Sequence, residues 1–296
     1  MTETTTSGSA AVVDTRTPRA RQRARLRRRF LSRPMALAGL VVLSLIALMA
    51  LAAPIFGDPG ANDFGAVLQP PSGAHVFGTD DLGRDVLARV AHGARVSMEA
   101  GVLAAALALV IGVPLGLVAG YYRGWVDLVI SRITDLMLAF PFLVLAVGLA
   151  AILGPSLRNV IIALGVTRVP GFIRVTRGEV LGLREQDYVA GAVADGASDA
   201  RILSRYILPN CLSPLIVQAT VTIPEAIIGE AILSFLGLGV QPPTPSCGTM
   251  LSSAQGFLSQ APYLALFPGI AIVLATLSFN LLGDGLRDVL DPKAVR

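Results

Sequence analysis

Long runs of uncharged, mostly apolar residues alternate with short polar segments along this chain. Residues 35–56 carry no charge, and further uncharged runs cover 100–122, 136–157, 206–224 and 231–283. A helix of about 20 apolar residues spans the hydrocarbon core of a bilayer. The last run is too long for one helix, and the prolines between residues 241 and 248 forbid a continuous helix there. It therefore predicts the end of one span, an outside loop and another span, which makes five clear spans.

A sixth span is predicted between residues 158 and 175, although only 159–167 is uninterrupted. Its presence follows from the distribution of arginine, because basic residues gather in cytoplasmic loops. With six spans, the amino terminus, the 123–127 turn, the polar 174–210 segment and the carboxyl terminus are all cytoplasmic. With five, a set of arginines would lie outside: Arg168, Arg174, Arg177, Arg184, Arg201 and Arg205. We therefore predict an all-α integral membrane protein with six transmembrane helices.

The same pattern divides the chain into segments. Residues 1–34 hold nine arginines and predict a disordered, basic cytoplasmic tail, which precedes a first transmembrane helix at 35–56. Residues 57–94 are expected outside, where Leu82, Val86 and Val90 predict an amphipathic surface helix capped by Thr79 or Asp80. The core, residues 95–286, has spans near 98–122, 129–153, 158–175, 211–236 and 263–283 and a polar segment at 176–210. Residues 287–296 form a second cytoplasmic tail.

Composition narrows the class of protein. Hydrophobic residues make up 53% of the 296 positions and charged residues only 15%, against roughly 25% charged in soluble proteins. Lys293 is the only lysine, so no Walker A loop exists, and the chain itself is expected to bind no cofactor and hydrolyse no ATP.

Cys211 and Cys247 fall at opposite ends of one predicted span and cannot pair. His75 and His92 are too few to indicate a metal site. For the basic tail, a topological role is favoured over nucleic-acid binding.

The polar 174–210 segment reads as two short helices joined at Gly196. Its first half has small residues at four positions, Ala190, Gly191, Ala192 and Ala194. A helix with such small side chains could pack closely in a groove of another protein. Glycine suits the tight turn. After the turn, Ser198 or Asp199 is expected to cap the second helix, Arg201 and Arg205 share one of its faces, and Pro209 ends it. The competing interpretation is an ordinary solvated loop.

Several motifs resemble the permease subunits of ABC importers. Ala190-Gly191-Ala192, then Gly196 and Leu208-Pro209 are similar to the EAA signature, in which Glu-Ala-Ala precedes Gly and Leu-Pro. Ala190 departs from that signature, because the family has glutamate there. FGTDDLGRD from residue 77 and LSFLGLGVQPPTPS from residue 233 resemble the dipeptide and oligopeptide branch, specifically its second, shorter permease. Cys247 stands where that branch commonly has tryptophan.

The resemblance implies the type I (MetI-like) importer fold with a cytoplasmic helix-turn-helix coupling segment at 187–209. It also implies a peptide importer in the cell membrane, with lipid around it, and no bound nucleic acid. A second homologous permease would complete the pathway, one or two ATPase subunits would bind ATP and Mg²⁺, and an extracytoplasmic solute-binding protein would deliver cargo. The residues expected to couple to the ATPase are Ala190, Gly191, Ala192, Gly196, Ser198, Arg201, Arg205, Leu208 and Pro209.

Ionisable residues within spans are costly, which makes each one a candidate for function. The candidates for a pathway or gate are Asp135, Phe140, Pro141, Glu225 and Glu230. Glu225 and Glu230 are five residues apart and so lie on different helix faces. Helix–helix pairing is an equally good account of these acids. In the outside segment, the candidates for docking the binding protein are Asp80, Asp81, Arg84 and Asp85, and salt bridges within the loop are the alternative there.

Two other classes of protein compete with the importer. A secondary transporter driven by an ion gradient would use Asp135, Glu225 or Glu230 as a proton relay. An intramembrane enzyme would need a nucleophile and a base at membrane depth, but both histidines fall outside the predicted spans and no GxSxG elbow is present. The enzyme is therefore disfavoured.

Overall fold

The computed structural model describes residues 31–290, so the predicted tails lie largely outside the described residues. Five helices are long and apolar enough to cross a membrane: α2 (Pro34–Leu51), α3 (Val86–Tyr122), α6 (Leu157–Leu183), α9 (Leu208–Phe235) and α11 (Tyr263–Leu290). Two shorter helices, α4 (Gly124–Ala139) and α5 (Phe142–Leu153), form a bent pair that passes the same test together. With the pair counted as one span, there are six. The fourth predicted span, α6, is present and extends to Leu183.

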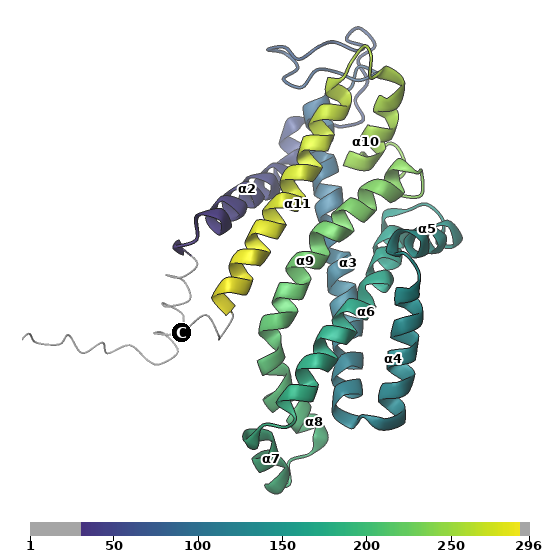
Figure 1. Cartoon of the computed structure of the whole chain (residues 1–296). Coiled ribbons are helices and arrows are strands. Elements are labelled where there is room, and N and C mark those ends of the chain that lie inside the picture. The colour runs from purple at the N-terminus through teal and green to yellow at the C-terminus, as the bar shows by residue number, and fades with distance from the viewer. Residues whose placement is uncertain (1–30, 291–296) are drawn as a thin grey trace, which may run out of the picture.

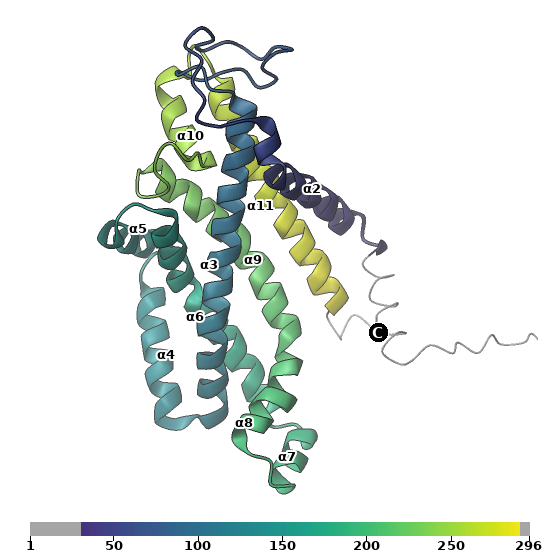
Figure 2. The same cartoon turned by 180° about the vertical axis from the view of Figure 1, so that it is seen from behind.

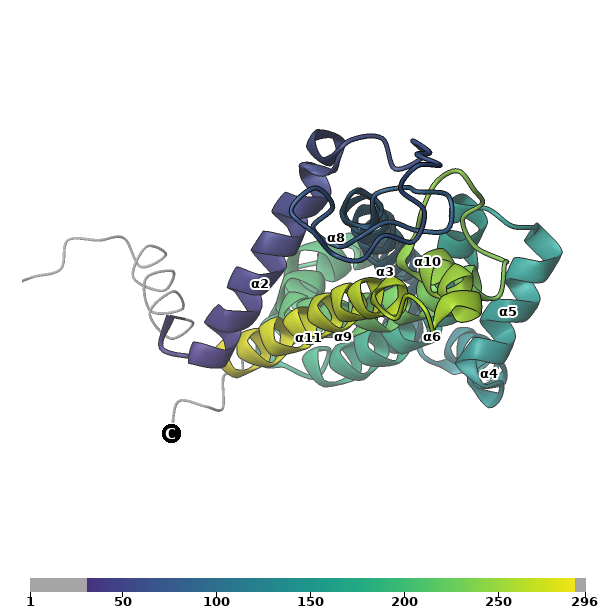
Figure 3. The same cartoon turned by 90° about the horizontal axis from the view of Figure 1, so that it is seen from above.

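The helices run mainly along one long axis (Figure 1). α3 descends the whole height of the molecule, α4 and α5 return the chain to the level where α6 begins, and α6 descends again. α7 (Asp187–Ala194) and α8 (Asp199–Arg201) lie at the lower end, and α10 (Cys247–Ala254) and the long loop before α3 lie at the upper end. Figure 2 shows α3 between α4 and α11 on the opposite face. From above, α2 and the α4–α5 pair lie on opposite flanks (Figure 3).

Helices α3 and α6 pack closely because α3 carries small residues at every fourth position. Ala104, Ala108, Gly112, Gly116 and Gly120 are all buried on α3. A Cβ atom at Gly116 would lie 2.6 Å from the Thr176 Cβ, and one at Gly112 would lie 2.6 Å from the Phe172 Cβ. Small residues at such spacing let membrane helices approach with their backbones nearly in contact. The spacing of these small residues is visible in the sequence, but it was not part of the prediction.

The amphipathic helix predicted outside the membrane is the first part of α3. Its N-cap is Asp85, whose Oδ1 accepts hydrogen bonds from the Leu87 and Ala88 amides at 2.8 and 3.1 Å. The predicted caps were wrong. Thr79 accepts a hydrogen bond from the Gln69 amide, and Asp80 accepts from the Leu82 and Arg84 amides inside the preceding loop. A surface helix and a span are thus one continuous element of 37 residues.

The third predicted span, 129–153, is not one helix. α4 and α5 meet at a bend of 93°. Proline disfavours helical geometry in the residue before it, and Phe140, which precedes Pro141, is extended at φ −89° and ψ 136°. The single span predicted at 129–153 is therefore a bent pair of helices, whose axis turns through nearly a right angle at Phe140-Pro141.

The remaining boundaries refine the predicted segments. The first span ends at Leu51, and the 3₁₀ turn η1 (Ala53–Phe56) follows it. The outside loop after α9 contains a helix that was not predicted, α10, and a second 3₁₀ turn, η3 (Gln255–Phe257). α11 runs to Leu290, so residues 287–290 are helical rather than tail. Arg33 and Asp288 pair at 3.0 Å and join the start of α2 to the end of α11.

Candidate functional site

The candidate coupling segment is a short helix, a glycine turn and the start of a long helix. α7 ends in a Schellman motif, in which the Ala197 amide donates to the Ala192 carbonyl at 3.0 Å and the Gly196 amide donates to the Val193 carbonyl at 3.0 Å. Gly196 has φ +75°, the left-handed geometry that glycine adopts without strain. The turn predicted at Gly196 is confirmed, and it folds the segment back toward α9.

α7 has an inner and an outer face. Val189 and Ala192 are buried, 2% and 4% exposed, in the apolar cluster that joins the ends of α6 and α9. Ala190, Gly191 and Val193 are exposed on the other side. Ala192 therefore belongs to the packing of the segment and not to its outer surface, which corrects the expectation that it meets a partner. The outer surface is nonetheless formed partly by small residues, Ala190, Gly191 and Ala194, beside the exposed Tyr188 and Val193.

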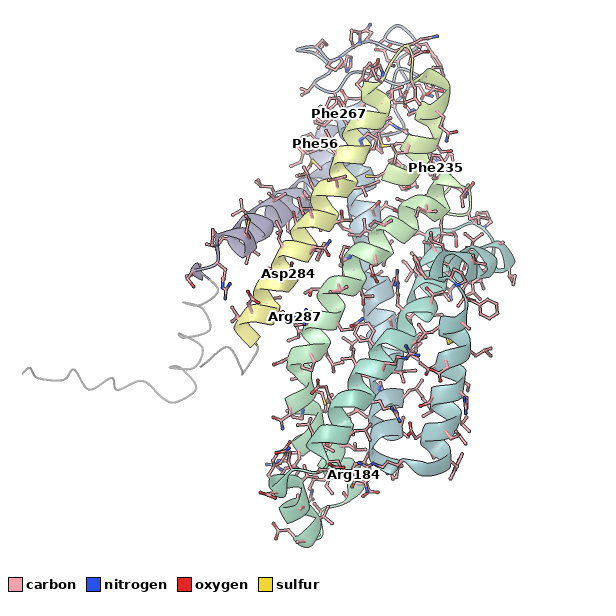
Figure 4. The ribbon with its side chains drawn as sticks, in the orientation of Figure 1. Phe56, Arg184, Phe235, Phe267, Asp284 and Arg287 are labelled. Atoms are coloured by element: carbon pink, nitrogen blue, oxygen red, sulfur yellow. The ribbon has the colours of Figure 1, made fainter. Side chains whose placement is uncertain are left out.

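Polar contacts hold the segment to the lower ends of α3 and α6. The Tyr121 hydroxyl donates to Asp199 Oδ1 at 2.9 Å, and the Arg184 guanidinium donates to the Tyr121 carbonyl at 2.5 Å while lying over its ring. Arg184 is seen at the lower end of the bundle in Figure 4. Arg123 and Glu185 pair at 2.8 Å next to these contacts. Asp199 thus binds α3 instead of capping its own helix.

The second helix of the segment does not stop at Pro209. α8 continues through a π-helical turn, η2 (Ile202–Ile207), directly into α9, where Pro209 occupies the first turn. The Leu208 amide bonds the Leu203 carbonyl, five residues back, and the Asn210 side chain donates to the Tyr206 carbonyl at 2.6 Å. Wide turns of this kind absorb an irregularity in a continuous helix. The expected ending at Pro209 was wrong, because α8, η2 and α9 follow one another without a break.

The other coupling residues lie near this turn. Ser198 occupies the N-cap position of α8 without a side-chain capping bond. Arg201 and Arg205 are exposed, and Leu208 is partly buried against the cluster beneath α7. Tyr188 of α7 is partly exposed, and burial, followed by the nearby Cys211 thiol, raises the pKa of its phenol. At neutral pH the hydroxyl therefore keeps its proton, and it accepts a long hydrogen bond from the Asn210 amide at 3.4 Å.

Two of the three acids proposed for the pathway pair with arginines of α6. Asp135 of α4 lies 2.8 Å from Arg174 of α6, and both side chains are more than half exposed. Glu225 lies 2.6 Å from Arg168. Helix–helix pairing, the alternative that the sequence left open for these acids, is therefore present for Asp135 and Glu225. Phe140 and Pro141 are exposed at the α4–α5 bend.

Glu230 differs from the other two acids because it is fully enclosed. Its two carboxylate oxygens accept hydrogen bonds from Ser97 of α3 and Ser234 of α9, both at 2.6 Å, and its exposure is 0%. The prediction that Glu225 and Glu230 face different surroundings is confirmed. In this conformation Glu230 ties helices together and touches no open pathway, so the pairing alternative describes it here.

The charged patch of the upper loop is bonded within itself. Asp80 pairs with Arg84 at 2.7 Å and with Arg89 at 3.3 Å, and Arg84 lies 3.6 Å from Asp81. Asp85 pairs with His75 at 2.9 Å. Internal salt bridging, one of the two alternatives for this patch, is therefore present. Phe77 of the loop also stacks on Phe267 of α11, with ring centroids 3.9 Å apart, near the top of the bundle (Figure 4).

The apolar spans within residues 31–290, with a short exposed helix at one end, define an all-α integral membrane protein. Residues 112–296 match the family model described as binding-protein-dependent transport system inner membrane component, and residues 22–71 match the N-terminal TM domain of oligopeptide transport permease C. The chain belongs to the family of binding-protein-dependent transport system inner membrane components. This is a family of transport permeases and not of enzymes.

Named relatives are similar along most of their length. The dipeptide transport system permease protein DppC of Alkalihalophilus pseudofirmus is 48% identical over 261 residues, which cover 88% of this chain and 86% of that protein. DppC of Haemophilus influenzae is 44% identical, over 87% of this chain and 90% of the relative. The glutathione transport system permease protein GsiD of Pectobacterium atrosepticum is 45% identical, over 90% and 89%.

Proposed function

We propose that this chain is one of two permease subunits of an ATP-driven importer of peptides. The relatives named above transport dipeptides or glutathione, itself a short peptide, according to their names. The observation that carries the proposal is α7, an exposed helix of small residues joined by the Gly196 turn to α9. Its ATPase partners bind ATP and Mg²⁺, since this chain has no Walker A lysine.

The proposed orientation puts α7 and both termini in the cytoplasm. Arg123, Arg184, Arg201 and Arg205 gather at the α7 end, in agreement with the bias of basic residues toward the cytoplasm. The loop 57–85 and α10 then face the outside, where the solute-binding protein docks beside Asp81, the acid of the patch with the greater exposure. Closure of the ATPases on nucleotide moves α7, and the unbroken connection from α8 to α9 transmits that movement to a span.

Cysteine crosslinking tests the docking of α7. We expect Ala190→Cys and Gly191→Cys to crosslink to a copurified ATPase subunit and the yield to change with nucleotide, because both positions are exposed on the outer face. Ala192→Cys is the matched control on the same helix, since its side chain is 4% exposed and lies in the apolar cluster on the inner side of α7. The native Cys211 and Cys247 are buried and supply the background. Absence of crosslinks at both outer positions, with and without nucleotide, contradicts this docking.

The source of energy separates the importer from an ion-gradient transporter. In cells or vesicles depleted of ATP while the proton gradient is maintained, we expect uptake to stop. In ATP-loaded vesicles without a gradient, uptake should continue, because α7 and not a proton relay drives the spans. Uptake that follows the gradient and ignores ATP would support the alternative, with Asp135, Glu225 or Glu230 as its proton carrier.

A further inference from the structure

Three side chains from three helices meet beside the α4–α5 bend. The Arg168 Nη1 atom of α6 lies 2.6 Å from the Glu225 Oε2 atom of α9, and the Arg168 guanidinium lies 3.7 Å above the centre of the Phe142 ring of α5. The ring also reaches α9, because a Cβ atom at Gly229 would lie 3.1 Å from the Phe142 Cζ atom. The bend after Pro141 thus places Phe142 as a support under Arg168.

The two charges differ in how they are held. The Arg168 side chain is 18% exposed, and its Nε atom is buried without a hydrogen-bond partner among residues 31–290. The Glu225 side chain is 46% exposed, and its Oε1 atom accepts no hydrogen bond within the same described range. Arginine stacked on an aromatic ring is held in one orientation. The cluster therefore presents a fixed cation and a carboxylate with an open oxygen.

Glu225 lies on the unburied stripe of α9. Val221, Ile228 and Phe235 are exposed at helical spacing from it, and α6 and α9 lie side by side on the face shown in Figure 1. Arg168 is eleven residues from the start of α6, or about 16 Å along the helix, which is well inside the bilayer. A charge that faces hydrocarbon at that depth is energetically costly. This stripe therefore faces water or protein and not lipid.

We propose that Glu225 is a transient site, inside the pathway, for the free α-ammonium group of the peptide. Arg168, supported by Phe142, is the positioning residue that directs the carboxylate. The inference rests on the proposed function, since peptides with free amino termini supply the ligand. An ammonium group donates up to three hydrogen bonds, and Oε1 is the open acceptor. A single charge-assisted contact stabilises by about 1.5 kcal/mol, roughly tenfold in affinity, which is weak enough for release.

The experiment uses the complete importer, with both permeases, the ATPases and the binding protein, in liposomes that take up alanyl-alanine. We expect Glu225→Gln to slow uptake about tenfold, the size of one charge-assisted contact, while complex yield and binding-protein-stimulated ATP hydrolysis stay within about twofold. Glu225→Cys should be slowed equally. A hydrophilic thiol reagent that adds a sulfonate should restore most of the rate, and one that adds a quaternary ammonium should not. Glu99→Cys, at an exposed glutamate of α3, is the matched control and should be insensitive throughout.

Each other outcome overturns the site. If the wild-type complex takes up peptide and the Glu225→Gln complex takes it up at the same rate, Glu225 is not an ammonium site. The proposed function is then unaffected. Failure of the reagents to modify Glu225→Cys shows that the stripe is not in a water-filled pathway. Loss of the second permease from the Glu225→Gln complex makes Glu225 an interface residue. If wild-type liposomes hydrolyse ATP but take up no peptide, the proposed function fails and this inference fails with it.

Discussion

Gly116→Leu is expected to abolish folding of the bundle. Among residues 31–290, α3 and α6 form the most extensive contact between two helices. At Gly116 the added Cβ atom alone would lie 2.6 Å from the Thr176 Cβ and 2.8 Å from the Ile173 carbonyl oxygen. That oxygen belongs to the backbone and cannot move aside without moving α6. Overpacking in a well-packed core costs about 1–3 kcal/mol and occasionally more. A leucine here requires separation of two spans, so we expect a loss above about 3 kcal/mol, seen as loss of purified, monodisperse protein.

The same contact predicts a graded series. Gly116→Ala adds only the clashing Cβ atom and should lower the thermal midpoint in detergent while leaving some folded protein. Gly269→Ala in α11 is the matched control, because nothing lies within 4 Å of a Cβ atom at that position. Alanine is better than glycine in a helix by about 0.5–1 kcal/mol, so this control should be neutral or slightly more stable. A Gly116→Leu protein as stable as wild type would show that α3 and α6 do not pack as described.

The spans themselves could be predicted because a bilayer demands uncharged residues over a fixed length. The count of six, the α6 span and the Gly196 turn all follow from that demand, from the arginine distribution and from the freedom of glycine. The GxxxG-like stripe of α3 was equally available in the sequence. Hydropathy does not reveal this stripe, because hydropathy measures apolarity and not side-chain size. Gly112 and Gly116 matter because they are small.

Other features depend on contacts between distant residues. Proline at 141 signals an interruption, but the bend of 93° brings Phe142 close to Gly229 of α9, a contact that no local pattern encodes. From the sequence, Arg168 was interpreted only as one of several basic residues that indicate the side of the membrane. Its pairing with Glu225 joins positions 57 residues apart, 225 minus 168. Likewise, Ala192 and Ala190 are the same residue type, and only the burial of Ala192 in the apolar cluster distinguishes the inner residue from the outer one.

Glu230→Ala is expected to destabilise the upper half of the bundle. Glu230 accepts hydrogen bonds from Ser97 and Ser234, and Ser246 at the start of α10 also lies against it. Removal of the carboxyl group leaves serine hydroxyls without their acceptor and a cavity beside them. Unsatisfied buried polar groups cost about 1–3 kcal/mol, and a cavity adds to this. We therefore expect a loss of about 3 kcal/mol, measured as a lower thermal midpoint of the purified protein.

Glu230→Gln separates a packing role from a role in transport. Glutamine has nearly the same volume, and serine hydroxyls can rotate to accept from its amide, so we expect the thermal midpoint of Glu230→Gln to stay close to wild type. Glu99→Ala, which removes an exposed glutamate from α3, is the matched control for the loss of a carboxylate. If Glu230→Gln folds normally and also transports normally, the carboxylate serves only to join α3, α9 and α10. If it folds normally but uptake stops, the enclosed cluster must open during transport, and Glu230 regains the pathway role predicted from the sequence.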